Sequence, residues 1–324
     1  MGEKKLCGKY EVSSSARFAF AAAYYKWQIY RLAHVKPKAV YSDRLFYNND
    51  TANAFIGQKI EENSAFVAAR FGANELGVVV SYLKSIGKHG NYSKNQVKAL
   101  CNNAGFFPSR TDQIDRFAEL MLSAAQEIDL LGVWNLMMED YIVEHFMSRN
   151  IALCPLGALE PWSSEKEYWS RHLKGKRVLV IHPFADTIVS QYQNRTKIFP
   201  TSDMLPEFEL FTVKAVQTAA GQVDSRFKDW FDALEYMLEK VMSTSFDIAI
   251  LGCGAYGFPL AAEIKKCGKI AIHLGGATQL LFGIKGKRWE SMPQINRLFN
   301  DAWVRPQAAD RPEAAGSIEN GCYW

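Results

Sequence analysis

The chain of 324 residues lacks the features that mark several classes of protein. None of its six cysteines forms a Cys-x-x-Cys pair or stands at zinc-ligand spacing with a histidine, so we expect buried, reduced thiols. No apolar stretch approaches the roughly 20 residues that span a bilayer. The polar start, MGEKKLCGKYEVSSS, has no apolar core of the signal-peptide type. These absences predict a cytoplasmic protein.

An excess of charge of one sign is also missing. The 38 basic and 34 acidic residues give a net charge of +4, and the basic residues are scattered along the chain. Nucleic-acid-binding domains gather their basic residues on one face, so we expect no nucleic acid as a partner. Hydrophobic residues make up 48% of the chain, which is enough to bury a large core.

The sequence does contain a regular alternation of short apolar runs and amphipathic segments. The apolar runs predict strands at residues 64–72, 151–154, 176–184, 208–217, 246–254 and 269–276. Helices are predicted at residues 51–62, 74–87, 93–103, 111–128, 141–150, 165–175, 186–195, 226–243, 255–268 and 277–284. This alternation is typical of an α/β, Rossmann-like fold with a mostly parallel sheet flanked by helices.

We expect three parts along the chain. Residues 1–50 form an N-terminal helical extension, in which residues 13–34 predict a helix rich in aromatic side chains. Residues 51–304 form the α/β domain, and residues 305–324 form a Pro-, Ala- and Gly-rich tail that wraps the surface or frays. Packing is the preferred role of the aromatic helix, with peripheral attachment to a membrane or to a partner as the alternative.

The clearest local motif is LGCGAYG, in which Gly252, Gly254 and Gly257 satisfy G-x-G-x-x-G, with Tyr256 between the last two. Such glycines let the chain turn sharply, and the N-terminus of the next helix can receive a phosphate. A dinucleotide site also needs an acidic residue at the end of the following strand, which ends here in His273. The sequence leaves three interpretations open: an NAD(P) site, a site for another phosphate or sugar group, and a tight turn for packing.

Another predicted strand is followed by a histidine and an aspartate, in VLVIHPFADT. His182 falls at the carboxyl end of the strand, where ligands bind in open α/β sheets. It is therefore a candidate for ligand contact or acid–base chemistry, with a purely structural role as the alternative. Asp186 opens the next predicted helix, and capping that helix is its preferred role, ahead of catalysis.

A third strand end, in FVAARFGANELG, gathers charged groups around a glycine. Arg70 ends the strand, Gly72 allows a tight turn, Asn74 is a candidate helix cap, and Glu75 lies in the first turn of the helix. Arginine can bind a phosphate through two N–H groups, and a carboxylate can hold a divalent cation that neutralises a diphosphate. An internal Arg–Glu ion pair that fixes the turn is the simpler alternative.

A resemblance to a known family rests on ARFGANE, which fits R-x-G-x-x-E, and on four later segments: VLVIHPFADTIVSQYQNR, FELFTVKAVQT, DIAILGCGAYGFPLAAEIKKCGKIAIHLGG and QLLFGIKGKRW. Together they resemble bacterial glycosyltransferases with the GT-D type fold. The resemblance implies transfer of a sugar from a nucleotide-diphosphate donor, with a UDP-sugar as the first choice. It implies a glycan or lipid-linked acceptor in polysaccharide or glycoconjugate assembly, and an enzyme that can work at the inner face of the membrane.

The resemblance also implies roles for residues of the R-x-G-x-x-E motif. It puts Arg70 and Gly72 at the donor and Glu75 at the diphosphate or at a bound Mn²⁺ or Mg²⁺, and Asn74 is the candidate for a ribose contact that the motif Asp would otherwise make. Members of the family often carry Asp-x-Glu in this motif, whereas this chain has Ala73 at the Asp position. Metal binding and any catalytic role of the motif therefore rest on Glu75 alone.

The chemistry of glycosyl transfer suggests roles for the other candidates. The turn with Gly252, Gly254, Tyr256 and Gly257 can present N–H groups to the leaving diphosphate. The candidates for the group that takes the proton of the acceptor hydroxyl are His182, Asp186 and His273, and the sequence does not choose among them.

Two other functions stay open. A Rossmann-type NAD(P)-dependent oxidoreductase would use the G-x-G-x-x-G turn. A non-catalytic protein that binds a nucleotide or glycan on a decayed transferase scaffold would fit the missing Asp at Ala73.

Overall fold

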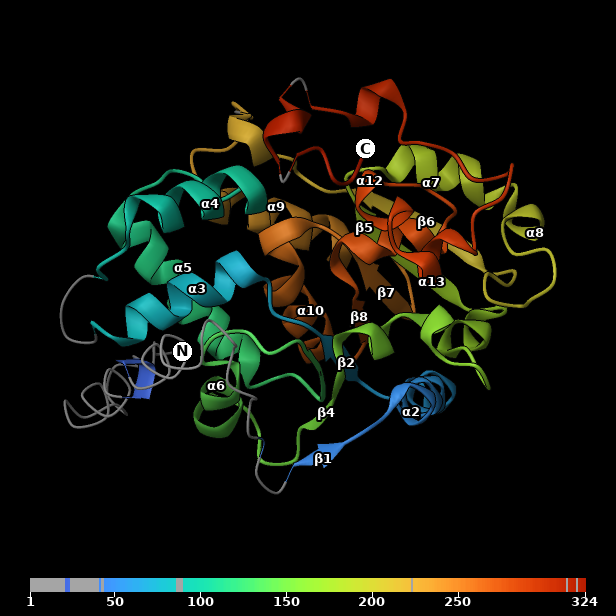
Figure 1. The fold of residues 1–324 in the computed structure, drawn as a ribbon, viewed down its shortest axis with the longest axis horizontal. Coiled ribbons are helices and arrows are strands. Elements are labelled where there is room, and N and C mark those ends of the chain that lie inside the picture. The colour runs from blue at the N-terminus through green and yellow to red at the C-terminus, as the bar shows by residue number, and fades with distance from the viewer. Residues whose placement is uncertain are drawn as a thin grey trace.

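The computed structural model describes residues 21–23, 41, 44–85, 90–222, 224–312, 314–318 and 320–324. In these residues one sheet of eight strands runs through the molecule, with helices on both faces (Figure 1). The order across the sheet is β1 (Leu45–Phe46), β4 (Ala152–Pro155), β3 (Leu130–Val133), β2 (Phe66–Ala69), β8 (Ile270–His273), β7 (Ile248–Leu251), β5 (Arg177–His182) and β6 (Glu209–Lys214). All neighbouring strands are parallel, which confirms the predicted α/β class and its Rossmann-like arrangement.

Both faces of the sheet are buried because the strand side chains alternate between two hydrophobic clusters. On β5, Leu179 and Ile181 belong to one cluster, and Val178 and Val180 belong to the other. The first face is covered by α3 (Ala73–Leu83), α4 (Lys94–Ala104), α5 (Thr111–Ala125), α6 (Glu139–Phe146), α9 (Trp230–Met242) and α10 (Gly257–Lys266). Burial on both sides explains why the strand sequences are continuous apolar runs rather than alternating ones.

The second face is covered by α helices and by several short 3₁₀ helices. The α helices are α2 (Asn49–Glu62), α7 (Ala185–Tyr192), α8 (Arg195–Ile198), α11 (Thr278–Leu281), α12 (Lys287–Glu290) and α13 (Pro293–Asn296). The 3₁₀ helices η2 (Leu156–Leu159), η3 (Pro161–Ser163) and η4 (Trp169–Leu173) lie between β4 and β5. The helix after β5 therefore packs on this face, while the helix after β7 packs on the first. Neighbouring strands whose connections diverge in this way open a crevice at their carboxyl ends.

Several predicted elements differ from those observed. Strands β1 and β3 were not predicted, and β1 joins the sheet before residue 51, where we expected the α/β domain to begin. The helix predicted at 165–175 is only the 3₁₀ helix η4. It is held by tertiary contacts, since the backbone N–H of Trp169 donates to Asn53 Oδ1 at 3.2 Å and its indole N–H donates to the Leu159 carbonyl at 2.8 Å.

Two predicted helix caps were also wrong. Helix α3 begins at Ala73 with Gly72 at the N-cap, so Asn74 lies inside the first turn. Helix α7 has Phe184 at its N-cap, so Asp186 does not cap it. The predicted stop of α3 at Gly87 falls outside the described residues, as does the helix at 13–34 except for residues 21–23, which are helical.

The C-terminal tail packs against the body of the molecule (Figure 1, red). Asp310, Ile318 and Cys322 are buried. The Ser317 carbonyl accepts a hydrogen bond from Asn102 Nδ2 of α4 at 2.8 Å, and the Cys322 carbonyl accepts one from the Arg288 N–H of α12 at 3.0 Å. The tail therefore bridges helices that belong to different faces of the sheet. In the described part of the chain, every helix is too short or too polar to cross a bilayer.

Candidate functional site

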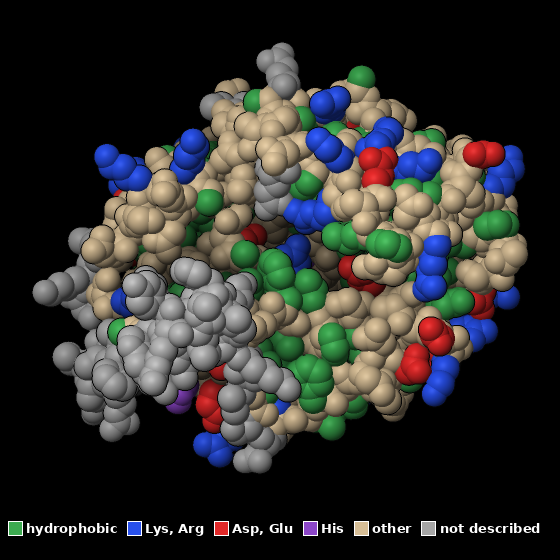
Figure 2. All heavy atoms as spheres, in the orientation of Figure 1, with side chains coloured by type: hydrophobic (Ala, Val, Ile, Leu, Met, Phe, Trp, Pro, Cys, Tyr) green, Lys and Arg blue, Asp and Glu red, His purple; other side chains and the backbone are tan. Residues whose placement is uncertain are grey.

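A cavity of about 830 Å³ opens at the carboxyl ends of β2, β5, β7 and β8. Figure 2 shows a hollow in this face of the molecule, with hydrophobic and basic side chains along it. The wall is completed by the η2–η3 segment, by α12 and by the C-terminal tail. Its position is the one at which open α/β sheets bind ligands, and its volume lies in the range of small-molecule sites.

Most of the predicted site residues line this cavity: Arg70, Gly72, Asn74, Glu75, His182, Gly252, Gly254, Tyr256 and His273. The structure thus brings together strand ends that are up to about 200 residues apart in the sequence, because parallel strands all end at the same edge of the sheet. Gly257 and Asp186 are not part of the wall.

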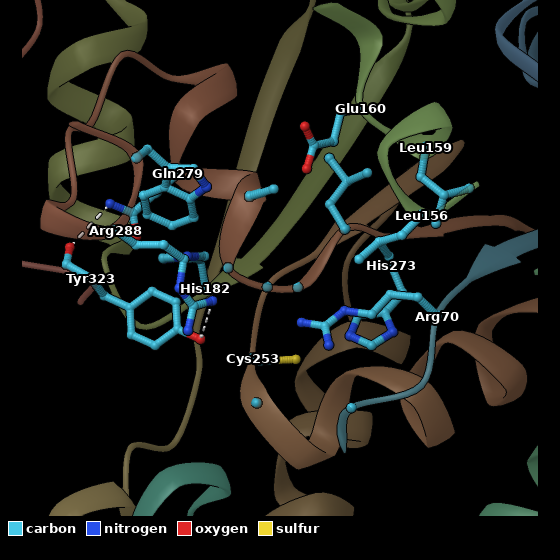
Figure 3. Close-up of a pocket in the computed structure, with 18 of the residues that line it drawn as sticks. Arg70, Leu156, Leu159, Glu160, His182, Cys253, His273, Gln279, Arg288 and Tyr323 are labelled. Carbon is cyan, nitrogen blue, oxygen red and sulfur yellow. Dashed lines mark hydrogen bonds between the residues drawn. The ribbon is translucent and has the colours of Figure 1, made fainter. Parts of the chain in front are cut away.

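Arg70 follows the last residue of β2, and its side chain points into the cavity (Figure 3). Its Nη1 donates to the Phe71 carbonyl at 3.2 Å, and its Cζ lies 6.0 Å from the centre of the Trp134 ring. Gly275, whose φ is +63°, leaves the space for this guanidinium, since a Cβ there would lie 2.1 Å from Nη2. The structure describes both Arg70 and Glu75, yet no ion pair within 4.0 Å joins them. The internal ion pair that was the simpler interpretation of this motif is therefore not formed.

Glu75 lies in the first turn of α3, with its carboxylate folded back over Gly72. A Cβ at Gly72 would lie 1.9 Å from Glu75 Oε2, so this glycine is needed for the approach of the carboxylate. In the described residues no three His, Cys, Asp or Glu side chains gather as metal ligands. One carboxylate does not make a site for Mn²⁺ or Mg²⁺, whose coordination would have to be completed by oxygens of a substrate.

The glycines of the G-x-G-x-x-G motif are accounted for by packing. A Cβ on Gly252 would lie 2.6 Å from the Gly275 carbonyl oxygen, and one on Gly257 would lie 2.4 Å from His273 Nε2. Gly254 has a φ of +59°, and its Cβ would lie 3.2 Å from the Ala104 carbonyl oxygen. Tyr256 is the last residue of the short 3₁₀ turn Gly254–Tyr256, and its side chain is buried. Among the three interpretations of this motif, the tight packing turn explains each glycine without a ligand.

His182, the last residue of β5, is buried and has a defined tautomer. Its Nδ1 accepts a hydrogen bond from the Phe184 N–H at 3.0 Å, which assigns the ring proton to Nε2. Burial lowers the pKa of His182 to about 3. The ring is therefore neutral near pH 7, and it can donate a hydrogen bond through Nε2 but is a poor base.

His273, the last residue of β8, is buried next to Arg70. Burial lowers its pKa to about 3, and the positive charge of Arg70 acts in the same direction. Its Nδ1 accepts no hydrogen bond from the described residues. Asp186, the third candidate base, is exposed outside the cavity, where its carboxylate pairs with Lys214 Nζ at 2.8 Å. Asp186 therefore forms a surface ion pair that joins α7 to β6.

Several polar side chains of the cavity were missed from the sequence, and three of them are labelled in Figure 3: Glu160, Arg288 and Tyr323. Glu160 lies between η2 and η3, and its Oε2 accepts a hydrogen bond from the Trp162 indole N–H at 2.8 Å. Arg288 of α12 points into the cavity and donates to the Tyr323 hydroxyl of the tail at 3.4 Å. None of the three ends a predicted strand, which was the signal that located the other candidates.

Trp134 belongs to a loop after β3 that is held by a buried carboxylate. Glu139 Oε2 accepts hydrogen bonds from the backbone N–H groups of Trp134 and Leu136, each at 3.1 Å. The Trp134 indole N–H donates in turn to the Phe71 carbonyl at 3.1 Å. Glu139 is fully buried, and this burial raises its pKa from 4.5 to about 7. Glu139 therefore fixes the loop that places the Trp134 ring beside Arg70.

The raised pKa of Glu139 predicts a pH dependence of stability. The folded protein keeps the Glu139 proton at pH values where the unfolded chain has lost it. The stabilisation is complete below pH 4.5 and is lost as the pH rises through about 7. In Glu139→Gln, the fall in unfolding free energy between pH 5 and pH 8 should be smaller than in the wild type by about 1 to 3 kcal/mol, as measured by urea unfolding. The control Glu235→Gln, on the exposed side of α9, should keep the wild-type fall, and an equal fall in Glu139→Gln would contradict the prediction.

No family model matches the chain, and comparisons with curated proteins and with solved structures found no match. The function of the protein is therefore to be inferred from the chemistry of this cavity and from the fold that builds it, an α/β fold of the Rossmann-like kind.

Proposed function

We propose that the protein is a glycosyltransferase of the GT-D type, which binds a nucleotide-diphosphate sugar in the cavity and transfers the sugar to an acceptor hydroxyl. The observation that carries the proposal is the approach of Arg70 and Arg288 to one cavity. Arg70 enters it from the end of β2, and Arg288 enters it from α12 (Figure 3). Because these side chains come from opposite sides, a diphosphate between them could contact both.

The surroundings of Arg70 favour a phosphate ligand. Helix α3 has eleven residues and begins at Ala73, so its N-terminal N–H groups and its dipole act on the same part of the cavity. His182 can add a neutral Nε2–H donor. Together these groups would stabilise the negative charge that develops on the diphosphate as the bond to the sugar breaks. Glu75 could bind a divalent cation only together with oxygens of the donor.

Flat aromatic side chains line other parts of the cavity: Trp134, Trp162, Tyr323 and Trp324. A nucleoside base or the apolar face of a sugar could stack on such rings. The acceptor in this proposal is a glycan or a lipid-linked sugar in polysaccharide or glycoconjugate assembly. A lipid-linked acceptor would put the enzyme at the inner face of the membrane.

The two alternative functions gain less support. The oxidoreductase depends on the G-x-G-x-x-G turn, whose glycines are accounted for by packing, and β8 ends in His273 rather than an acidic residue. The non-catalytic binding protein would use the same cavity and the same arginines. Only a measurement of sugar transfer distinguishes this binding protein from the transferase.

Ligand binding tests the proposal. We expect UDP or GDP to raise the melting temperature of the protein, and NAD, NADP and CMP to leave it unchanged, each with and without Mn²⁺. A nucleoside diphosphate at 100 times its Kd should stabilise the fold by about 2.7 kcal/mol. Calorimetry measures the Kd directly. Stabilisation by NAD alone would overturn the transferase proposal, and nucleoside diphosphate binding without sugar release from any nucleotide sugar would favour the binding protein.

A further inference from the structure

Glycosyl transfer needs a group that takes the proton of the acceptor hydroxyl. The structure weakens each candidate that the sequence offered. His182 uses its Nδ1 to accept a hydrogen bond and is neutral, His273 is buried next to a cation, and Asp186 lies outside the cavity. Glu75 is folded over the first turn of α3. The proton acceptor must then be sought among the residues that the sequence did not indicate.

Glu160 has the geometry that such a group requires. Its carboxyl group points into the cavity from the η2–η3 segment (Figure 3). The Trp162 indole N–H donates a hydrogen bond to Glu160 Oε2 at 2.8 Å, while Glu160 Oε1 accepts no hydrogen bond from the described residues. The segment that carries it is firmly packed, since Ala158, Leu159 and Trp162 are all buried. One oxygen is therefore held in place, and the other is open to a ligand.

The electrostatic surroundings of Glu160 suit proton transfer near pH 7. Burial raises its pKa to about 7, and the Trp162 N–H and the charge of Arg70 oppose this rise. Of the other ionisable side chains in the wall, His182 and His273 are neutral, Glu165 and Arg297 are exposed, and Glu75 and Arg288 have contacts of their own. Arg70 and Glu160 share the cavity without an ion pair within 4.0 Å, so a ligand could lie between them.

We propose that Glu160 is the catalytic base of this cavity, an inference that rests on the proposed glycosyltransferase function. The acceptor oxygen forms a bond to the anomeric carbon of the donor sugar. The bond from that carbon to the phosphate oxygen breaks, and its electron pair stays on the nucleoside diphosphate. The acceptor proton passes to the Glu160 carboxylate and is released to water after the products leave.

The charge of Arg70 couples the binding of an anion in the cavity to the protonation of Glu160. A diphosphate bound at Arg70 offsets the positive charge that holds the pKa of Glu160 down. Its pKa should therefore rise when UDP binds, and the wild-type protein should take up a fraction of a proton that Glu160→Gln cannot take up. UDP itself changes protonation near pH 7, because the second pKa of a phosphate is about 6. The informative quantity is the difference between the two proteins.

Calorimetry of UDP binding at pH 7, in two buffers of different ionisation enthalpy, measures this difference. We expect UDP to bind Glu160→Gln with a Kd within about threefold of the wild-type value, with less proton uptake. The exposed control Glu239→Gln should match the wild type in both respects. Equal proton uptake in the wild type and Glu160→Gln would overturn the role of Glu160. Failure of the wild type to bind UDP and GDP would instead remove the glycosyltransferase function on which it rests.

Turnover gives a second, independent measurement. With a nucleotide sugar that the wild type uses, Glu160→Gln should lower kcat by about 100- to 10,000-fold, because general base catalysis contributes an effect of that size. The acid limb of the wild-type pH profile, where the rate rises with pH as Glu160 loses its proton, should disappear in the variant. A kcat within about threefold of the wild-type value, or an unchanged acid limb, would show that Glu160 is not the base.

Discussion

Arg70→Met should weaken the binding of UDP by about 10- to 100-fold, because a hydrogen bond to a charged group contributes about 1.5 to 3 kcal/mol. In the proposed reaction the loss in kcat/KM should be larger, about 1,000-fold, since negative charge grows on the diphosphate in the transition state. Arg70→Lys should recover only part of the affinity. A lysine keeps the charge but lacks the planar pair of N–H groups.

The control for this series is Arg110→Met, an exposed arginine next to the start of α5 that pairs with Asp112. It should leave the Kd for UDP unchanged in calorimetry. The unfolding free energy of Arg70→Met should also stay close to that of the wild type, because the Arg70 side chain donates its hydrogen bond to the carbonyl of the adjacent residue Phe71 and not to a distant element. Wild-type UDP binding by Arg70→Met would remove the observation on which the proposed function depends.

Trp230→Ala should lower the unfolding free energy by about 3 to 5 kcal/mol, the usual cost of deleting a large buried aromatic side chain. Trp230 is fully buried, and its ring stacks on Tyr256 with centroids 4.7 Å apart and an angle of 5° between the planes. It also contacts Phe106, Phe117 and Phe231 at centroid distances of 5.1 to 5.7 Å. Since Tyr256 belongs to the turn after β7 and lines the cavity, the same substitution should weaken UDP binding.

Trp230→Phe is the matched control. It keeps an aromatic ring in the cluster, and it removes the Trp230 indole N–H, which is buried and donates to none of the described residues. Its cost should therefore be well below that of Trp230→Ala, and urea unfolding measures both. A cost of less than about 1 kcal/mol for Trp230→Ala would mean that the surrounding side chains collapse into the space left by the indole.

The local pattern of apolar residues was sufficient to predict most strands of the sheet. Strands β5, β7 and β8 were predicted because each is a run of apolar residues long enough to be buried on both faces. Strand β3 was missed because one of its four residues is a glycine, and glycine weakens a strand pattern. That glycine, Gly132, is required by a neighbour distant in sequence, since its Cβ would lie 2.7 Å from Leu159 Cδ1.

The candidate site was predicted in part, for the same reason. A residue at the end of a predicted strand must lie at the edge of the sheet where ligands bind, so the sequence could locate Arg70, His182 and His273. It could not show that the Phe184 N–H occupies His182 Nδ1, or that Asp186 faces away from the cavity toward Lys214. Side-chain direction and protonation depend on neighbours that only the folded chain supplies.

The sequence by itself determined the α/β class, the parallel sheet and the strand ends that carry Arg70 and His182, because apolar periodicity and strand-end position are local properties of the chain. The tertiary structure alone decided that the glycines of LGCGAYG serve packing, because their neighbours come from other strands and helices. It also decided that Glu160 and Arg288 enter the cavity. Glu160 lies on a 3₁₀ segment and Arg288 beneath the C-terminal tail, and no local pattern marks either position as the wall of a site.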